Sequence, residues 1–145
     1  MNILVLVLLS ARLTFGGLGE VRIGMSVAEL ERVADVRRGD LESGAAPCRY
    51  VLFEQATIGV RIARSRVVAI EVVDPHHRTL SGIVVGSSVA AVREAYGARA
   101  ELDGSRFVVR SRDRMRALVI DTDGSVVTRL VSGEAKFAER LHACL

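Results

Sequence analysis

An internal repeat is the feature that most constrains how this chain can fold. Val21–Ala34, with the sequence VRIGMSVAELERVA, matches Ile83–Tyr96, with the sequence IVVGSSVAAVREAY, in register over its whole length. Gly24 aligns with Gly86, and each glycine is followed by a serine of the type that caps helices and then by a helical pattern of apolar residues. Each copy therefore reads as a short strand, a glycine turn and an amphipathic helix, and the match predicts a duplicated unit.

Strand patterns follow each predicted helix, which we place at residues 27–34 and 89–96. The predicted strands are Cys48–Glu54, Thr57–Ala63 and Arg66–Val73 in the first half and Ser105–Arg110, Met115–Asp121 and Ser125–Val131 in the second. Asp123-Gly124 between the last two is a strong hairpin signal. We predict an α+β fold of two tandem α-β-β-β repeats, residues 12–74 and 82–145, in which an antiparallel sheet packs against helices. A solvated linker over 75–81 joins the repeats, and a length of 145 residues suits one compact unit that shares a core.

The N-terminus carries an apolar run, Ile3–Leu9, followed by Ser10 and Ala11. This length suits the hydrophobic region of a secretory signal peptide and is too short to span a bilayer. We predict a signal peptide over residues 1–11 and a secreted or periplasmic protein with no stable membrane insertion once the signal is removed. The alternative is a buried first strand.

Two cysteines, Cys48 and Cys144, form an even pair in a chain that we expect to be exported. An oxidising compartment favours one disulfide between them, and the bond would hold the C-terminal tail. Two buried thiols are the first alternative, and a catalytic cysteine paired with His142 is the second.

Composition argues against several functional classes. A net charge of +3 without an aromatic-lined basic stripe argues against nucleic-acid binding. His76 and His77 are adjacent and would point in opposite directions on an extended chain, so they do not suggest a metal site. No pair of carboxylates or nucleophile–base spacing stands out, so we predict no enzyme, no catalytic residue, no metal and no cofactor.

The best local candidate for a contact surface is an arginine-rich hairpin in the second half. Arg110, Arg112 and Arg114 alternate with other residues, and residues 111–114 read as the hairpin tip. The guanidinium group of arginine can donate two parallel hydrogen bonds to a carboxylate, and aromatic side chains dominate the energetics of many interfaces. The candidate partner-binding residues are Tyr50, Phe53, Arg61, Phe107, Arg110, Arg112 and Arg114. The alternatives are a solvated hairpin tip and aromatic side chains that pack in the core.

The chain resembles a family of uncharacterised secreted bacterial proteins with two tandem helix–hairpin units. The resemblance rests on GGLGEVRIGMSVAELE, CRYV, RVVAIEV, GIVVGSSVAAVREAYG and the cysteine near the end, and it covers nearly all of the chain after Ala11. The unit is similar to that of the β-lactamase inhibitor proteins and of the SmpA/OmlA-type assembly lipoproteins, which implies function by protein–protein contact. The chain lacks the tryptophans of the inhibitors and the lipobox cysteine of the lipoproteins, so no target is implied.

The sequence therefore predicts a non-catalytic exported protein-binding module, similar to an inhibitor or an envelope-assembly factor. One alternative is an arginine-lined binder of an acidic glycan or another anion, and the other is a small secreted hydrolase.

Overall fold

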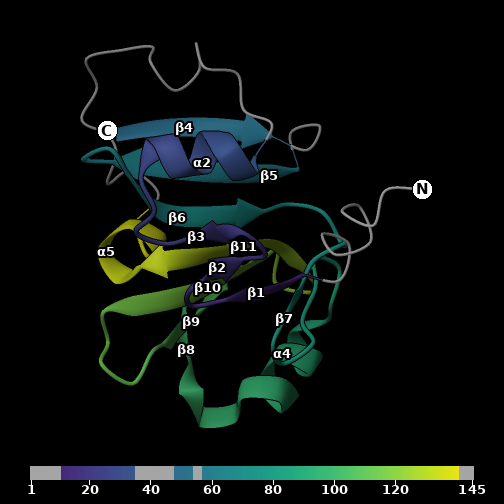
Figure 1. The fold of residues 1–145 in the computed structure, drawn as a ribbon. Coiled ribbons are helices and arrows are strands. Elements are labelled where there is room, and N and C mark those ends of the chain that lie inside the picture. The colour runs from purple at the N-terminus through teal and green to yellow at the C-terminus, as the bar shows by residue number, and fades with distance from the viewer. Residues whose placement is uncertain (1–10, 35–47, 54–56, 141–145) are drawn as a thin grey trace.

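The computed structural model describes residues 11–34, 48–53 and 57–140, and within strands it does not describe the side chains of Cys48 and Phe53. The chain forms an α+β fold with two mainly antiparallel sheets and few helices (Figure 1). The large sheet has the order β4 (Cys48–Phe53), β5 (Ile58–Ala63), β6 (Arg66–Val72), β11 (Val127–Glu134), β10 (Arg116–Thr122), β9 (Arg106–Arg110) and β8 (Ala100–Asp103). The small sheet has the order β3 (Val21–Arg22), β2 (Gly17–Leu18), β1 (Arg12–Thr14) and β7 (Arg78–Thr79).

The two faces of the large sheet have different coverings. One face packs against α2 (Val27–Val33), α4 (Val89–Tyr96) and the small sheet, and this layer encloses the main core around Leu30, Val92 and Ile70. We call the other face the open face. Its covering among the described residues is α5 (Ala135–Ala138), a four-residue helix that contacts β6, β10 and β11. A smaller apolar cluster lies under α5.

The glycine turn before each helix joins the large sheet through the same set of backbone hydrogen bonds. Gly24 N donates to Val67 O over 2.8 Å, and Gly86 N donates to Val127 O over 2.8 Å. The two glycines have φ values of +93° and +99°, a backbone region that residues with a Cβ rarely adopt. The predicted serine caps are present, because Ser26 Oγ accepts from the third residue of its helix and Ser88 Oγ does the same in α4.

The predicted linker over 75–81 is largely exposed, but it is not solvated along its whole length. It contains β7, which pairs in parallel with β1, and it places His77 and Thr79 in the buried interior. Thr79 Oγ1 accepts a 2.8 Å hydrogen bond from the hydroxyl of Tyr96 on α4. The segment therefore ties the small sheet to the second half.

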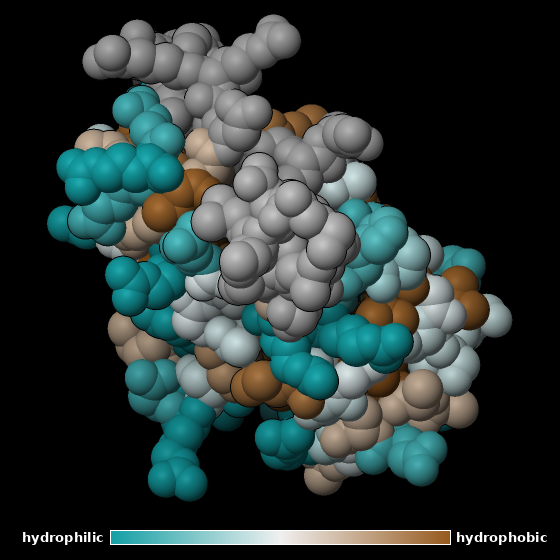
Figure 2. Space-filling view, turned by 45° about the vertical axis from the view of Figure 1, so that its right-hand side comes forward, coloured by the Kyte–Doolittle hydropathy of each residue, from teal (hydrophilic) through white to brown (hydrophobic). Residues whose placement is uncertain are grey.

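Figure 2 is turned so that the right-hand side of Figure 1 comes forward. Over the part of this surface that is not grey, apolar residues occur in small separated groups among hydrophilic ones. None of the helices formed by the described residues has the length and apolar character that a membrane span requires.

Candidate functional site: a polar network on the open sheet face

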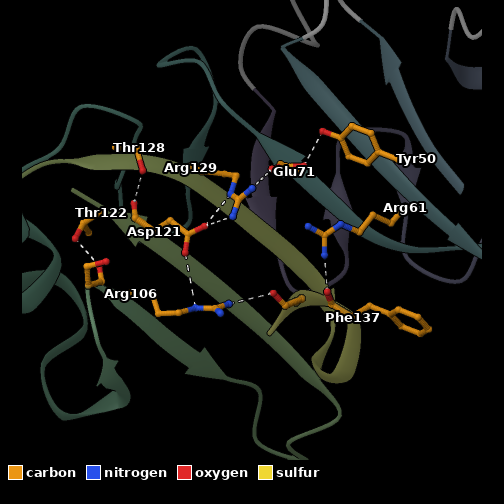
Figure 3. A network of polar contacts seen from close by, with 11 residues as sticks. Tyr50, Arg61, Glu71, Arg106, Asp121, Thr122, Thr128, Arg129 and Phe137 are labelled. Atoms are coloured by element: carbon orange, nitrogen blue, oxygen red, sulfur yellow. Dashed lines mark hydrogen bonds and ion pairs between the residues drawn. The ribbon is translucent and has the colours of Figure 1, made fainter. Parts of the chain in front are cut away.

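A row of polar and charged side chains crosses the open face of the large sheet. It runs from Tyr50 on β4 through Glu71 on β6, Arg129 on β11 and Asp121 on β10 to Arg106 on β9 (Figure 3). Strand register explains the second half of this row, because Asp121 lies directly opposite Arg129 on one side and Arg106 on the other. Cross-strand neighbours of opposite charge attract each other, so the register itself builds the network.

Tyr50 reaches Glu71 by lying across the strand between them. Its hydroxyl donates a 2.6 Å hydrogen bond to Glu71 Oε2, and its ring covers Gly59 on β5. A Cβ at position 59 would lie 2.3 Å from the Tyr50 hydroxyl oxygen, so a side chain there would displace the ring. Burial raises the pKa of Tyr50, and the hydrogen bond to Glu71 raises it further, so the phenol stays protonated.

Arg129 is the centre of the network. Its Nη1 lies 2.8 Å from Glu71 Oε1, and its Nε and Nη2 lie 2.7 and 2.6 Å from Asp121 Oδ2. Burial acts to lower the pKa of Arg129, but the hydrogen bonds and charges of Asp121 and Glu71 outweigh it and raise the pKa. The guanidinium of Arg129 therefore holds two carboxylates, one on each of the two strands that flank β11.

Arg106 continues the row and attaches it to α5. Its Nε lies 3.7 Å from Asp121 Oδ1, and its Nη2 donates to Ala138 O over 3.4 Å. Arg110, on the same strand, forms ion pairs with Glu101 on β8 and with Glu139 just after α5. The open face thus holds its short helix through arginine side chains from the sheet.

Arg61 does not belong to an exposed contact surface, contrary to the prediction. It is buried, and its Nη1 donates a 2.6 Å hydrogen bond to Phe137 O on α5. Burial lowers the pKa of its guanidinium. The alternating pattern could not reveal this burial, because α5 covers Arg61 and a helix of four residues gives no periodic signal.

Phe107 is also wrong as an exposed anchor. It is buried in the main core, and the guanidinium of Arg93 on α4 lies 5.9 Å from its ring centre. The alternative of core packing holds at this position.

Other predicted contact residues do lie at the surface. Tyr50 is half exposed, and Arg112 and Arg114 are exposed at the tip between β9 and β10, as the hairpin pattern predicts. The side chain of Phe53 lies outside the described part, as do Cys144 and the side chain of Cys48, so the predicted disulfide stays a prediction. Tyr50 and Arg110 both join polar networks on the open face, but Arg112 and Arg114 do not.

Sequence reasoning missed the core of the network. Glu71 stands as a single acid in the apolar run RVVAIEVV, and Asp121 and Arg129 flank the predicted Asp123-Gly124 turn. Pairing the two strands from a two-residue turn at Asp123-Gly124 would place Asp121 opposite Val126, whereas a register shift between Asp121 and Thr122 brings it opposite Arg129. The sequence thus brought the two strands together but gave no signal for the Asp121–Arg129 pair or for the contact of Arg129 with Glu71.

No known family model matches the sequence, and no curated protein matches it. The fold is similar to that of the uncharacterized protein YfeY from Escherichia coli, with a TM-score of 0.58 and 10% identity over 85% of this chain and 99% of that one. It is also similar to part of an extracellular protein containing an SCP domain from Bacillus anthracis, with a TM-score of 0.52 and 11% identity over 85% of this chain and 47% of that one.

At such identities the likeness concerns the fold. It relates the chain to bacterial proteins, one of them uncharacterized and one extracellular. These comparisons give no support to the predicted likeness to β-lactamase inhibitor proteins or assembly lipoproteins, which remains a prediction.

Proposed function

We propose that this protein is a non-catalytic exported binding module that docks a partner protein on the open face of its large sheet. The observation that carries the proposal is a group of partly exposed apolar side chains beside the charged network. Tyr50 is 50% exposed, Leu52 on the same strand 48%, and Val73, the residue that follows β6, 45%. An aromatic anchor with aliphatic neighbours and a polar rim is the composition that protein interfaces favour.

The network favours recognition over chemistry. Glu71 and Asp121 are both held by Arg129, and the raised pKa of Tyr50 keeps its hydroxyl a hydrogen-bond donor. A catalytic acid or base needs a proton that it can release or accept near neutral pH. Groups fixed in charge and position instead supply a rigid surface, which lowers the entropic cost of binding a partner.

The proposal includes export and duplication. Cleavage after Ala11 would leave all of β1 in the mature chain, and an extracellular protein is among the similar structures. The equivalent turns at Gly24 and Gly86, each hydrogen-bonded to the start of a strand that follows a hairpin, support an ancestral α-β-β-β repeat. A Cys48–Cys144 disulfide would join the β4 edge to the chain terminus.

Site-specific photocrosslinking tests the docking face. A photoreactive amino acid placed at Leu52 should give a discrete protein adduct in the exported fraction of the host cells. The matched control is Leu102 on β8, which is also an exposed strand leucine, 56% accessible, at the opposite edge of the sheet. The Tyr50→Ala variant should lose the Leu52 adduct. Identical adducts from both positions, or no adduct from Leu52, would refute the proposal.

A further inference from the structure

A hollow of about 620 Å³ lies beside the start of α5, between the tips of two hairpins. It is lined by Arg64 from the β5–β6 turn, by Arg114 from the β9–β10 turn, by Arg116 at the start of β10, and by Lys136 from α5. These hairpins belong to opposite halves of the chain, so the fold, and not local sequence, gathers the four cations. The hollow is separate from the apolar group formed by Tyr50, Leu52 and Val73.

None of the four cations forms an ion pair in the part of the chain that the structure describes, and Arg116 instead donates to Phe15 O over 3.2 Å. Arg64, Arg114 and Lys136 are all exposed. By contrast, Arg110 and Arg129 each contact two carboxylates. Like charges held close together repel each other, so an anion bound among them would be stabilised.

The backbone at both hairpin tips is strained. Among the described residues other than glycine, Arg64, Ser65 and Arg114 are those with positive φ, at 54°, 62° and 62°. Glycine or asparagine would adopt this region at lower cost. Strain of this kind concentrates at functional sites, and here it places two arginines at the edge of one hollow.

The remaining lining indicates what kind of anion would fit. Asp113 and Glu134 lie among the cations and can accept hydrogen bonds from hydroxyl groups, and Met115 and Ala135 add an apolar surface. The volume exceeds what a single inorganic anion fills.

We propose that this hollow binds an acidic oligosaccharide, whose carboxylate or sulfate groups contact the arginines and Lys136. The sugar hydroxyls donate to Asp113 and Glu134, and the C–H face of a ring lies against Met115. This site is independent of the proposed docking face.

The test compares two variants that remove the same charge. Arg64→Gly with Arg114→Gly removes two cations from the hollow and relieves backbone strain. Arg22→Gln with Arg32→Gln removes two exposed cations from the surface beside α2, outside the hollow. Calorimetry with a heparin-derived hexasaccharide and with hexagalacturonate gives the affinities, and thermal unfolding gives the stabilities.

We expect the glycine pair to bind at least one of the two sugars about tenfold more weakly than the unmodified chain, with an unchanged or higher melting temperature. The glutamine pair should stay within about twofold, because nonspecific attraction is screened at physiological salt. Equal loss in both pairs, or no loss in the glycine pair, would overturn the proposal. Tighter binding of hexaglutamate, or equal competition by inorganic sulfate, would also overturn it. None of these results bears on crosslinking at Leu52.

Discussion

Gly59→Ala tests whether the Tyr50 ring holds the open face together. The new Cβ would lie 2.3 Å from the Tyr50 hydroxyl oxygen and 2.6 Å from the ring carbon that bears it, so the ring must leave its place. The displaced phenol loses its 2.6 Å hydrogen bond to the Glu71 carboxylate. Hydrogen bonds to charged groups contribute about 1.5–3 kcal/mol, whereas alanine is favoured over glycine within a strand by about 0.5–1 kcal/mol.

The net expectation is a loss of about 1–2 kcal/mol in the free energy of unfolding. Urea denaturation followed by circular dichroism measures it. The decisive control is the same substitution in a Tyr50→Ala background, where no ring occupies the space above residue 59. There Gly59→Ala should stabilise the protein by about 0.5–1 kcal/mol, so the effect changes sign. The same loss in both backgrounds would refute the role assigned to Tyr50.

Four further predictions concern other contacts. Gly133→Ala should lower the free energy of unfolding, measured by urea denaturation, by about 3 kcal/mol or more, because the new Cβ would lie 2.2 Å from the backbone atom Val68 O, which cannot rotate away. An unchanged urea midpoint would contradict this close approach. Arg129→Met should destabilise the protein by about 2–3 kcal/mol, because it removes the ion pair of the buried Glu71 and leaves Asp121 with the longer contact to Arg106. A Met variant as stable as the parent would show that the network contributes little. Backbone hydrogen bonds from Val126 and Ser125 lower the pKa of Asp123. The ionised carboxylate therefore stabilises the fold fully above its unfolded pKa of about 3.9, and this stabilisation is lost as the pH falls through the folded pKa. Asp123→Asn should make the free energy of unfolding less dependent on pH in the acid range, and an unaltered dependence would exclude this cause. Intact-mass measurement of exported protein should give a mass two protons below that of the reduced form, whereas two alkylatable thiols would exclude the Cys48–Cys144 bond.

The parts of the fold that the sequence predicts correctly depend on local chemistry. Serine caps at residues 26 and 88 mark the helix starts, and the Asp123-Gly124 turn fixes the β10–β11 hairpin. These signals act within a few residues, so they need no knowledge of the rest of the chain. The strands that they bound are present at nearly the predicted positions.

The parts that the sequence does not predict depend on contacts between distant segments. The small sheet uses strands of two or three residues, which are too short to show alternation, and it pairs β1 with β7 across most of the first half. β8 was missed because its alternation covers only four residues, three of which are exposed. The burial of Arg61 and the contact of Glu71 with Arg129 were not predicted, because nothing in the sequence marks α5 or a diagonal contact between strands.

The central claim is that the open face recognises a protein, and affinity for the partner crosslinked at Leu52 tests it most directly. Surface plasmon resonance should show that Tyr50→Ala weakens binding by about fivefold or more, the loss expected of an interface anchor. Leu102→Asp should bind like the parent chain. An unaltered affinity for Tyr50→Ala, or an equal loss for Leu102→Asp, would contradict the account.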